Sequence, residues 1–255
     1  MKKIDKIKLT KTFAVYLIIT LVVVFKVGCG NNGGITGSNL ETEATSTSEP
    51  TPTQPAITVV IGDIISFGDY DWRVLDVEGD YALIITENII SYQWYHRGTF
   101  ENPTWETRWE TSEMREYLNT TFFNTFSTAD RTRIRETTVI NNWNPWFYIY
   151  GGNDTTDRIF LLSIEEVVQY FGDSGQLANR PKGALWITDE YSEARIARDA
   201  AGSASWWWLR SPGNHRSTAA RVSNRGYLFM IGYSVYSSWG IGNGVRPALW
   251  LNLIP

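Results

Sequence analysis

The feature that most constrains this chain is a run of three tryptophans, Trp206–Trp208, in a protein with a single cysteine. That cysteine is Cys29, so no disulfide can form in the chain. The sequence holds 12 tryptophans, and burying one aromatic ring removes roughly 150–250 Å² from water. We therefore expect the tryptophans to build a hydrophobic core and not, in the main, a platform for a ligand.

The tryptophan run reads as a β-strand that a Pro-Gly pair ends. Side chains alternate between the two faces of a strand. Trp207 and Leu209 are therefore predicted to lie on one face, and Trp206, Trp208 and Arg210 on the other.

The N-terminal residues resemble a bacterial lipoprotein signal. Residues 1–11 carry five lysines and one aspartate. Residues 13–25 are almost continuously apolar, which is short for a membrane span of about 20 residues. Lys26-Val-Gly-Cys29 resembles a lipobox, although Lys26 stands where such motifs carry leucine or a similar residue. We expect residues 1–29 to be a signal with a lipidated Cys29, or else an uncleaved N-terminal anchor. Either one predicts an exported domain, anchored to the membrane and facing outside.

Composition divides the rest of the chain in two. Residues 30–56 are rich in Gly, Ser, Thr, Pro and Glu, which is typical of a disordered spacer. From Ile57 short β-rich runs and helical patterns alternate, and residues 57–255 are predicted to be a single α+β domain. An N-terminal β-meander is expected at Ile57–Ile61, Ile64–Phe67, Trp72–Val77 and Tyr81–Ile85.

Helix signals follow the meander. Thr111 or Ser112 can cap a helix to about Leu118, and capping-box patterns begin at Ser127 and Ser163. The second pattern opens an apolar run to Phe171 that Gly172 stops. Further elements are expected at Ile159–Leu162, as a buried strand, at Tyr191–Ala201, as a helix, and after Trp206, where the chain is β-rich to its end.

Charge and composition exclude several functions. Removing the six lysines and one acid of residues 1–29 from 23 basic and 27 acidic side chains leaves 17 and 26, a net charge of −9. That charge argues against a nucleic-acid partner. The only histidines, His96 and His215, are far apart, so neither a metal site nor a cofactor is expected. Beyond the signal 16 arginines accompany one lysine, Lys182, and we expect arginine–tryptophan stacks.

A set of residues spread along the chain carries a resemblance to a known family. The tail holds Trp207-Trp208-Leu-Arg210-Ser-Pro-Gly213 and Gly244-Val-Arg246-Pro247-Ala-Leu, and two segments upstream belong with it. The structural signature is Trp109, Arg115, Asn119, Asp157, Trp207, Trp208, Arg210, Gly213, Arg246 and Pro247.

Together these residues resemble a bacterial surface domain of unassigned function. Their tail is similar to that of C-type-lectin-like folds, which include the formylglycine-generating-enzyme group, and to variable proteins diversified by retroelements. The resemblance implies central Trp-Leu-Arg and Val-Arg-Pro-Ala-Leu strands, with the loops between them on an outer face. Arg210 and Arg246 are then expected to pair with buried carboxylates such as Asp157 or Glu110.

The segment between the two motifs has the composition of a binding loop. Asn214–Asn243 is rich in Ser, Tyr, Asn, Arg and Gly, which supply rigid contact area and adaptable hydrogen bonds. An ordinary glycine-rich β-tail is the alternative. Fixed positions are expected at Val222, Gly226, Val235 and Gly244. The predicted ligand-binding residues are His215, Arg216, Arg225, Tyr227, Phe229, Tyr233, Tyr236 and Trp239.

Hypervariable loops are one implication of the resemblance. The segment contains no Lys, Glu, Gln or Asp. Mutagenesis of adenines in asparagine codons that end in a pyrimidine cannot produce Lys, Glu or Gln. Met230 and Trp239 do not fit this scheme and would have to be fixed.

The favoured hypothesis is a membrane-tethered protein that binds an extracellular protein or glycan. A formylglycine-generating activity needs a cysteine pair that this chain lacks, and the motifs of calcium-dependent lectins are absent. The alternative is a surface enzyme acting on carbohydrate or peptide through two carboxylates, with Glu101, Glu106, Glu110 and Asp154 as unselected candidates. A purely structural module is a third hypothesis.

Overall fold

A computed structural model describes residues 58–96, 107–236 and 242–254, all of which belong to one compact unit. The fold is mixed α+β, strand-rich with a few short helices, as the sequence predicts. Within these residues, no helix is long and apolar enough to cross a membrane. The predicted signal with its Cys29, and the spacer after it, lie outside the described residues.

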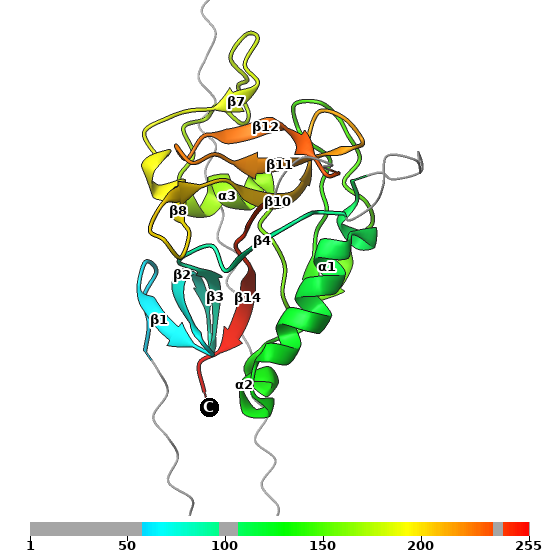
Figure 1. Cartoon of the computed structure of the whole chain (residues 1–255). Helices are drawn as coiled ribbons and strands as arrows, with labels where there is room; N and C mark the ends of the chain where they lie inside the picture. Colours follow the sequence, from blue (N-terminus) through cyan, green and yellow to red (C-terminus); the bar gives the residue numbers. More distant parts are fainter. Residues whose placement is uncertain (1–57, 97–106, 237–241, 255) are drawn as a thin grey trace, which may run out of the picture. The chain divides into compact units, whose positions relative to one another are not determined.

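The N-terminal strands form an antiparallel four-stranded sheet, and its fourth strand comes from the C-terminus (Figure 1). Its order is β1-β2-β3-β14, with β1 at Ile64–Phe67, β2 at Tyr70–Glu78, β3 at Tyr81–Thr86 and β14 at Ala248–Asn252. Three runs of the predicted meander are thus confirmed. The described part of the first, residues 58–61, is not a strand. There the Val60 amide donates to the Asp63 carboxylate and the chain turns.

The second sheet has six strands in the order β4-β13-β10-β11-β12-β7, and it contains the predicted β-rich tail. Every neighbouring pair is antiparallel except β10 and β13, which are parallel. Its strands are β4 (Ser91–Gln93), β13 (Asn243–Val245), β10 (Trp207–Pro212), β11 (Thr218–Val222), β12 (Leu228–Ser234) and β7 (Trp186–Ile187).

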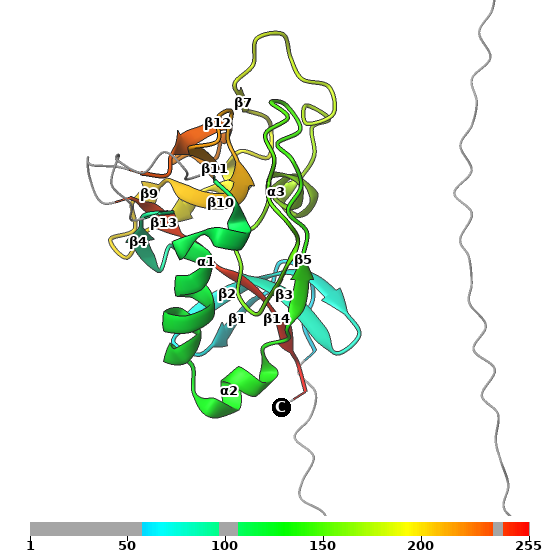
Figure 2. The same ribbon diagram turned by 90° about the vertical axis from the view of Figure 1, so that its right-hand side faces the viewer.

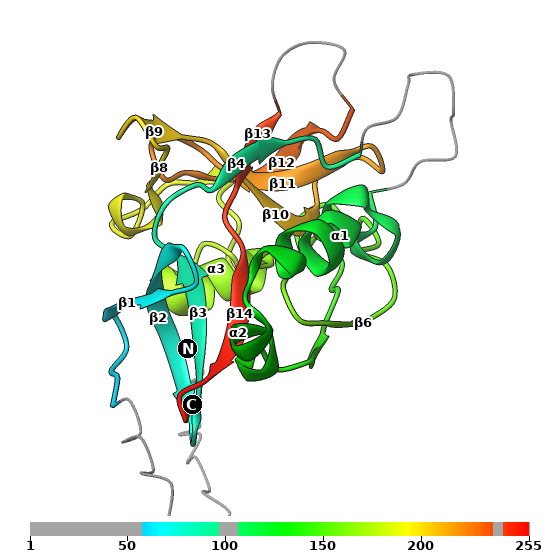
Figure 3. The same cartoon turned by 60° about the horizontal axis from the view of Figure 1, so that its bottom comes forward.

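The C-terminal segment joins the two sheets. Figure 3 shows it passing from β13 in one sheet to β14 in the other. Arg246 and Pro247 form the link, and both bind Thr86 at the end of β3. The Arg246 Nε donates to the Thr86 carbonyl at 2.8 Å, and the Thr86 amide donates to the Pro247 carbonyl at 3.0 Å.

Short helices and two small hairpins complete the domain, with α1 and α2 beside β14 (Figure 2). The helical elements are η1 (Trp109–Thr111), α1 (Glu113–Tyr117), the π-helical η2 (Leu118–Phe122), η3 (Phe123–Thr125), α2 (Thr128–Arg133), α3 (Ile164–Phe171) and η4 (Glu193–Arg195). The hairpins pair β5 (Thr137–Val139) with β6 (Thr155–Asp157), and β8 (Ala197–Arg198) with β9 (Ala204–Ser205).

The predicted helix caps are confirmed. The hydroxyls of Ser112, Ser127 and Ser163 each accept a hydrogen bond from a backbone amide three residues on. At Ser163 the box is complete, because the Glu166 carboxylate also accepts from the Ser163 amide at 2.9 Å. Gly172 ends α3 with a φ of 120°, which a side chain would disfavour.

The helix predicted at Tyr191–Ala201 is wrong. Only η4 forms there, and the β8–β9 hairpin follows it. The buried Asp189 carboxylate accepts from both terminal nitrogens of Arg195, at 2.9 and 3.0 Å. The indole of Trp207 donates to the Arg195 carbonyl at 3.1 Å, so that carbonyl is used outside any helix.

The strand predicted at Ile159–Leu162 is also not formed, although all four residues are buried. Phe160 pairs with Ala248 as an isolated bridge. The Leu162 carbonyl accepts from the Arg210 amide at 3.0 Å. This segment therefore pairs with two strands from different sheets and extends neither of them.

Tryptophans build the core, as the sequence predicts. Trp72, Trp109, Trp207 and Trp208 are all fully buried. The expected arginine–tryptophan stacks are present as well. The pairs are Arg221 with Trp206 (3.8 Å), Arg180 with Trp146 (5.0 Å), Arg246 with Trp207 (5.1 Å) and Arg135 with Trp250 (5.9 Å), measured from guanidinium carbon to ring centroid.

The alternation predicted along the tryptophan strand does not extend to Arg210. Trp207 packs against Phe171, and Arg210 pairs with Glu166, so both reach the same helix, α3. The register between β10 and β11 shifts between Trp208 and Pro212, which breaks strict alternation. All six residues of β10 are buried, because the strand is covered on both faces.

Both arginines expected to pair with Asp157 or Glu110 pair elsewhere. Arg210 forms a two-pronged ion pair with Glu166, including a 2.7 Å bond to Oε1. Arg246 lies 4.0 Å from Glu87.

Asp157 belongs to the other half of the signature. Its carboxylate accepts from the Trp109 indole at 2.7 Å and from Arg115 at 2.6 Å. Asn119 holds the next turn of chain, since its side chain donates to the Ile159 carbonyl and accepts from the Arg158 amide. The carboxylate that pairs with Arg210 is therefore Glu166 of α3. The Asp157 carboxylate is instead hydrogen-bonded by Trp109 and Arg115.

Glu166→Gln tests the pair with Arg210. Glutamine preserves the side-chain volume, and its oxygen can still accept the hydrogen bond from the Ser163 amide. It leaves the buried guanidinium of Arg210 without the negative charge of Glu166. Because Glu166 is a quarter exposed (26%), we expect the loss to be roughly 2 kcal/mol in the free energy of unfolding, below that of a fully buried pair. Chemical denaturation measures it.

Glu165→Gln is the matched control. Burial raises the pKa of Glu165, and its Oε2 has no hydrogen-bond partner among the described residues. A neutral amide should therefore change the free energy of unfolding by no more than about 0.5 kcal/mol. Equal losses from both variants would show that Arg210 does not depend on Glu166.

Candidate functional site

Strand register brings four side chains into one row across the six-stranded sheet. Trp208 of β10 lies opposite Arg221 of β11, Arg221 opposite Phe229 of β12, and Phe229 opposite Trp186 of β7. Directly opposed residues share a face of the sheet. Trp208 is fully buried, Arg221 and Phe229 are partly buried, and Trp186 at the end of the row is 38% exposed.

Arg221 is held between two aromatic rings on this face. Its guanidinium carbon lies 3.8 Å from the Trp206 ring centroid and 4.0 Å from that of Tyr233. Its NH1 donates to Asn243 at 3.0 Å, while its Nε has no partner among the described residues. Burial lowers the pKa of Arg221 to about 10, and Tyr233 opposes that shift. The side chain therefore remains a cation at neutral pH.

The rings continue beyond Arg221. Phe229 stacks on Trp186 with centroids 5.2 Å apart and meets Trp206 edge-on at 4.8 Å. We call the set of Trp186, Trp206, Arg221, Phe229 and Tyr233 the outer face. Its two most exposed members, Trp186 (38%) and Tyr233 (43%), offer apolar area to a partner.

A shallow pocket of about 380 Å³ opens beside the outer face, at the turn between β11 and β12. Trp206 and Phe229 form its apolar part, and Ser223, Asn224, Arg225 and Tyr227 form its polar rim. The Ser223 hydroxyl accepts from the amides of Arg225 and Tyr227, which holds the rim in shape.

Gly226 anchors that turn. It has a φ of 75°, and a Cβ there would lie 1.6 Å from the Ser192 carbonyl oxygen. Only glycine fits such an approach. The turn is thus pressed against the η4 region, while the side chains of its neighbours face outward.

The predicted ligand-binding residues fall into two groups. Arg225, Tyr227 and Phe229 surround the pocket, and Tyr233 belongs to the outer face. His215, Arg216 and Tyr236 lie at the opposite end of the strands, beside the turn between β10 and β11. Trp239 lies outside the described residues. The structure therefore brings together four of the eight.

The described positions that were expected to be fixed are buried or closely packed. Val222 and Val235 are fully buried, as is Met230. A Cβ on Gly244 would lie 2.7 Å from the Trp206 carbonyl and 2.6 Å from Ile89. A Cβ on Gly213, in the signature, would lie 2.4 Å from the Ile231 carbonyl.

Sequence reasoning missed three members of the outer face. Trp206 was assigned to the scaffold with its neighbours, and neither Arg221 nor Trp186 was predicted to bind a ligand. One signal was available: Trp206 and Trp208 are two residues apart, so in a strand their side chains would share a face. Using that signal requires the register with β11 and β12, which residues far along the chain determine.

The two histidines are in different environments. His215 is exposed, and its Nδ1 lies 2.8 Å from the Ser217 hydroxyl. His96 is buried between Tyr95 and Tyr236, at 5.7 and 6.3 Å between ring centroids. Its Nε2 has no partner among the described residues. Burial lowers the pKa of His96, and Glu113 only partly opposes this shift.

The carboxylates considered for an enzyme are engaged in loop contacts. Glu110 accepts from the Asn153 amide group at 2.7 Å, and Asp154 accepts from the Asn141 backbone at 2.9 Å. Glu101 and Glu106 lie outside the described residues. In the described ranges, no group of three or more His, Cys, Asp and Glu side chains is placed to hold a metal ion.

Comparison with known proteins gives one match. The sequence model of a family described as a domain of unknown function, DUF6273, matches residues 79–253. Neither a curated protein nor a solved structure matches the chain.

The burial of His96 predicts a pH dependence of stability. Its pKa in the folded state is below the ordinary value of about 6.5 that applies to the unfolded chain. As pH falls through 6.5, the unfolded chain takes up a proton that the folded domain does not. The contribution to stability is complete above that pH and is lost as pH falls toward the folded pKa.

His96→Phe should flatten the pH dependence between about pH 7 and 5 in denaturation curves. His215→Phe is the matched control, because that side chain is exposed, and it should retain the wild-type slope. If His96→Phe keeps the full slope, another group titrates in this range and the assignment to His96 is wrong.

Proposed function

The chain belongs to the DUF6273 family, and we propose that its domain is a binding module that recognises an extracellular protein or glycan through the outer face. The observation that carries the proposal is Arg221, a half-buried cation held between the rings of Trp206 and Tyr233. It forms no ion pair with a carboxylate of the described residues. Tryptophan, tyrosine and arginine are the residues most often found at the centres of binding surfaces.

The geometry suits recognition better than catalysis. Trp186 and Tyr233 present partly exposed rings from two strands, so contact area is supplied by a rigid sheet. The adjoining pocket adds the exposed side chains of Asn224 and Arg225, which can form hydrogen bonds with a partner. Such a combination of aromatic area and adaptable polar groups is typical of binding loops.

The scaffold proposed for this surface is the C-type-lectin-like fold. What supports it is the central place of the two tail motifs: β10 lies inside the six-stranded sheet, and the Arg246-Pro247 link joins both sheets. For the context of the domain, the proposal keeps the sequence-based expectation of an exported protein. Cys29 would carry the lipid, and residues 30–56 would hold the domain away from the membrane.

Truncation of the two exposed rings tests the outer face. The labelled domain is screened on a glycan array and on a panel of extracellular proteins. The affinity of the best partner is then measured for the wild type, Tyr233→Ala and Trp186→Ala. We expect each variant to lose about tenfold or more in affinity, because exposed aromatic anchors dominate binding energy. Melting temperatures check that both variants fold.

Ile64→Ala provides the control, since it truncates an exposed apolar residue (47%) on the other sheet. It should bind like the wild type. Unchanged affinity in both aromatic variants would remove the outer face from the binding site. Turnover of a wall polymer that Glu110→Gln abolishes would instead favour the alternative of a surface enzyme.

Diversification by a retroelement is a further part of the proposal. Its support is that the positions between the motifs divide into two classes. Val222, Gly226 and Met230 are constrained by packing, whereas Arg225 and Tyr233 are exposed and could change without loss of the fold.

Deep sequencing of the codons for residues 213–244 in a clonal culture, with the adjoining kilobases, tests this idea. We expect substitutions at adenines in the codons of exposed residues, none at Met230, and a near-copy of the segment beside a reverse transcriptase. The codons of β2 provide a background rate. An invariant segment without a copy would end the retroelement hypothesis and leave a single fixed ligand.

A further inference from the structure

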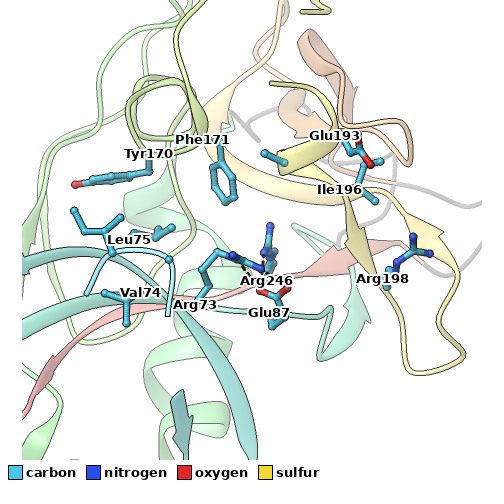
Figure 4. A pocket seen from close by; sticks show the side chains of 13 residues that line it. Arg73, Val74, Leu75, Glu87, Tyr170, Phe171, Glu193, Ile196, Arg198 and Arg246 are labelled. Carbon is cyan, nitrogen blue, oxygen red and sulfur yellow. Dashed lines mark hydrogen bonds and ion pairs between the residues drawn. The ribbon is translucent and has the colours of Figure 1, made fainter. Parts of the chain in front are cut away.

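A second cavity lies where the two sheets meet, and none of its lining residues belongs to the outer face. Its volume is about 410 Å³, within the range of about 300–1,000 Å³ typical of small-ligand pockets. β2, the end of α3, η4 and the link between β13 and β14 all contribute to its wall. Figure 4 shows the side chains of Arg73 and Arg246 converging near Glu87 in this cavity.

Arg246 is fully buried, yet its hydrogen bonds are incomplete. Its Nε donates to the Thr86 carbonyl at 2.8 Å, and its NH2 lies 4.0 Å from Glu87, too far for a good hydrogen bond. Its NH1 has no partner among the described residues. A buried donor without an acceptor is costly, and in native proteins it signals a missing water, ion or ligand.

The charges around Arg246 leave one positive charge over. Glu87 is already committed to Arg73, accepting at 2.8 Å from Nε and 2.6 Å from NH2. Two arginines therefore share one carboxylate. Burial lowers the pKa of Arg246 to about 10, Glu87 opposes the shift and Arg73 adds to it. Arg246 is thus still charged at neutral pH.

The remaining walls are mainly apolar. Val74 and Leu75 come from β2, Phe171 from α3, and Ile196 from the chain after η4. Two further charged residues, Glu193 and Arg198, lie at the exposed edge and have opposite signs. The cavity as a whole therefore has one surplus positive charge and a mainly apolar wall.

We infer that this cavity binds a monoanionic carboxylate, with the carboxylate on Arg246 and Arg73 and an apolar body against Leu75, Phe171 and Ile196. A single surplus charge matches a monoanion, whereas Glu87 would repel a phosphate dianion more strongly than a monoanion. Arginine binds carboxylates in two-pronged geometry, which suits a donor pair that protein acceptors leave open. The inference is independent of the outer face, which could fail without affecting it.

Benzoate and benzamide form the first test, because they differ in charge and hardly in shape. Isothermal titration of the folded domain should detect benzoate and find benzamide about tenfold weaker or undetectable. Inorganic phosphate should bind more weakly than benzoate. If benzoate does not bind at concentrations up to about 10 mM, or benzamide binds equally well, the inference is overturned and water satisfies Arg246.

Ala194→Phe locates the binding without touching the buried arginine, whose replacement could unfold the domain. Ala194 is exposed at the rim, and a phenyl ring there would fill the cavity. We expect benzoate affinity to fall about tenfold or more. Ala200→Phe, an equally exposed alanine in the β8–β9 turn, should bind like the wild type. Equal binding by both variants would place benzoate elsewhere and overturn the inference.

A pair of peptides distinguishes the source of the carboxylate. Gly-Gly-Phe presents the group at the end of a chain, and its C-terminal amide lacks it. Tighter binding of the free peptide than of benzoate would assign the cavity to chain ends, and the reverse order to small free acids. In either case the amide should bind about tenfold more weakly than the acid, and equal binding of the two peptides would count against the carboxylate.

Discussion

The ion pair between Glu166 and Arg210 is the interaction that holds α3 against the central strand β10. The Glu166 carboxylate caps α3 by accepting from the Ser163 amide and neutralises Arg210. Arg210 in turn donates to the carbonyls of Leu161 and Ile140. One ion pair, between the buried Arg210 and the partly exposed Glu166, therefore ties a helix, a strand and two connecting segments together, in a protein with no disulfide to do so. Breaking such a pair leaves an uncompensated charge in the interior.

The position of β10 determines the outer face. Once the strand is fixed, Trp207 is directed toward α3 and Trp208 toward Tyr95, which meets it edge-on at 5.8 Å. Trp206, one residue earlier, then lies over Arg221 of the next strand. The aromatic surface is thus a consequence of how the core is packed, and its rings need no support from flexible loops. This rigidity lowers the entropy that binding would cost.

Local patterns in the sequence predicted local structure well. The Ser163–Glu166 spacing identified a capping box that exists, and the turns at Gly68 and Gly79 lie between strands that form a meander. Interactions that span the chain were not predictable. The partner of Arg210 lies 44 residues away, and nothing in composition distinguished Glu166 from Asp157. The Tyr191–Ala201 pattern favoured a helix, but the Arg195 carbonyl accepts a hydrogen bond from the indole of Trp207, which is distant in the sequence.

The same distinction holds for the candidate sites. Residues 214–243 could be recognised as polar and aromatic from composition alone, and four of the eight chosen side chains do gather at the outer face and its pocket. Trp186 could not be chosen, because its place depends on β7 pairing with the distant β12. The cavity at Arg246 was beyond prediction for the same reason, since its wall combines residues from both ends of the chain.

The path of the last strands has a consequence for biogenesis. β13 completes the six-stranded sheet and β14 completes the four-stranded sheet. β14 and its partner β3 lie near opposite ends of the domain's sequence. Because the chain is synthesised from its N-terminus, neither sheet can close until β13 and β14 have been made. Pairing between such distant segments is slow, and the exposed edges of β3 and β10 would meanwhile be open to other strands. The two sheets are therefore among the last parts of the domain to close, and its stability depends on segments that are made last.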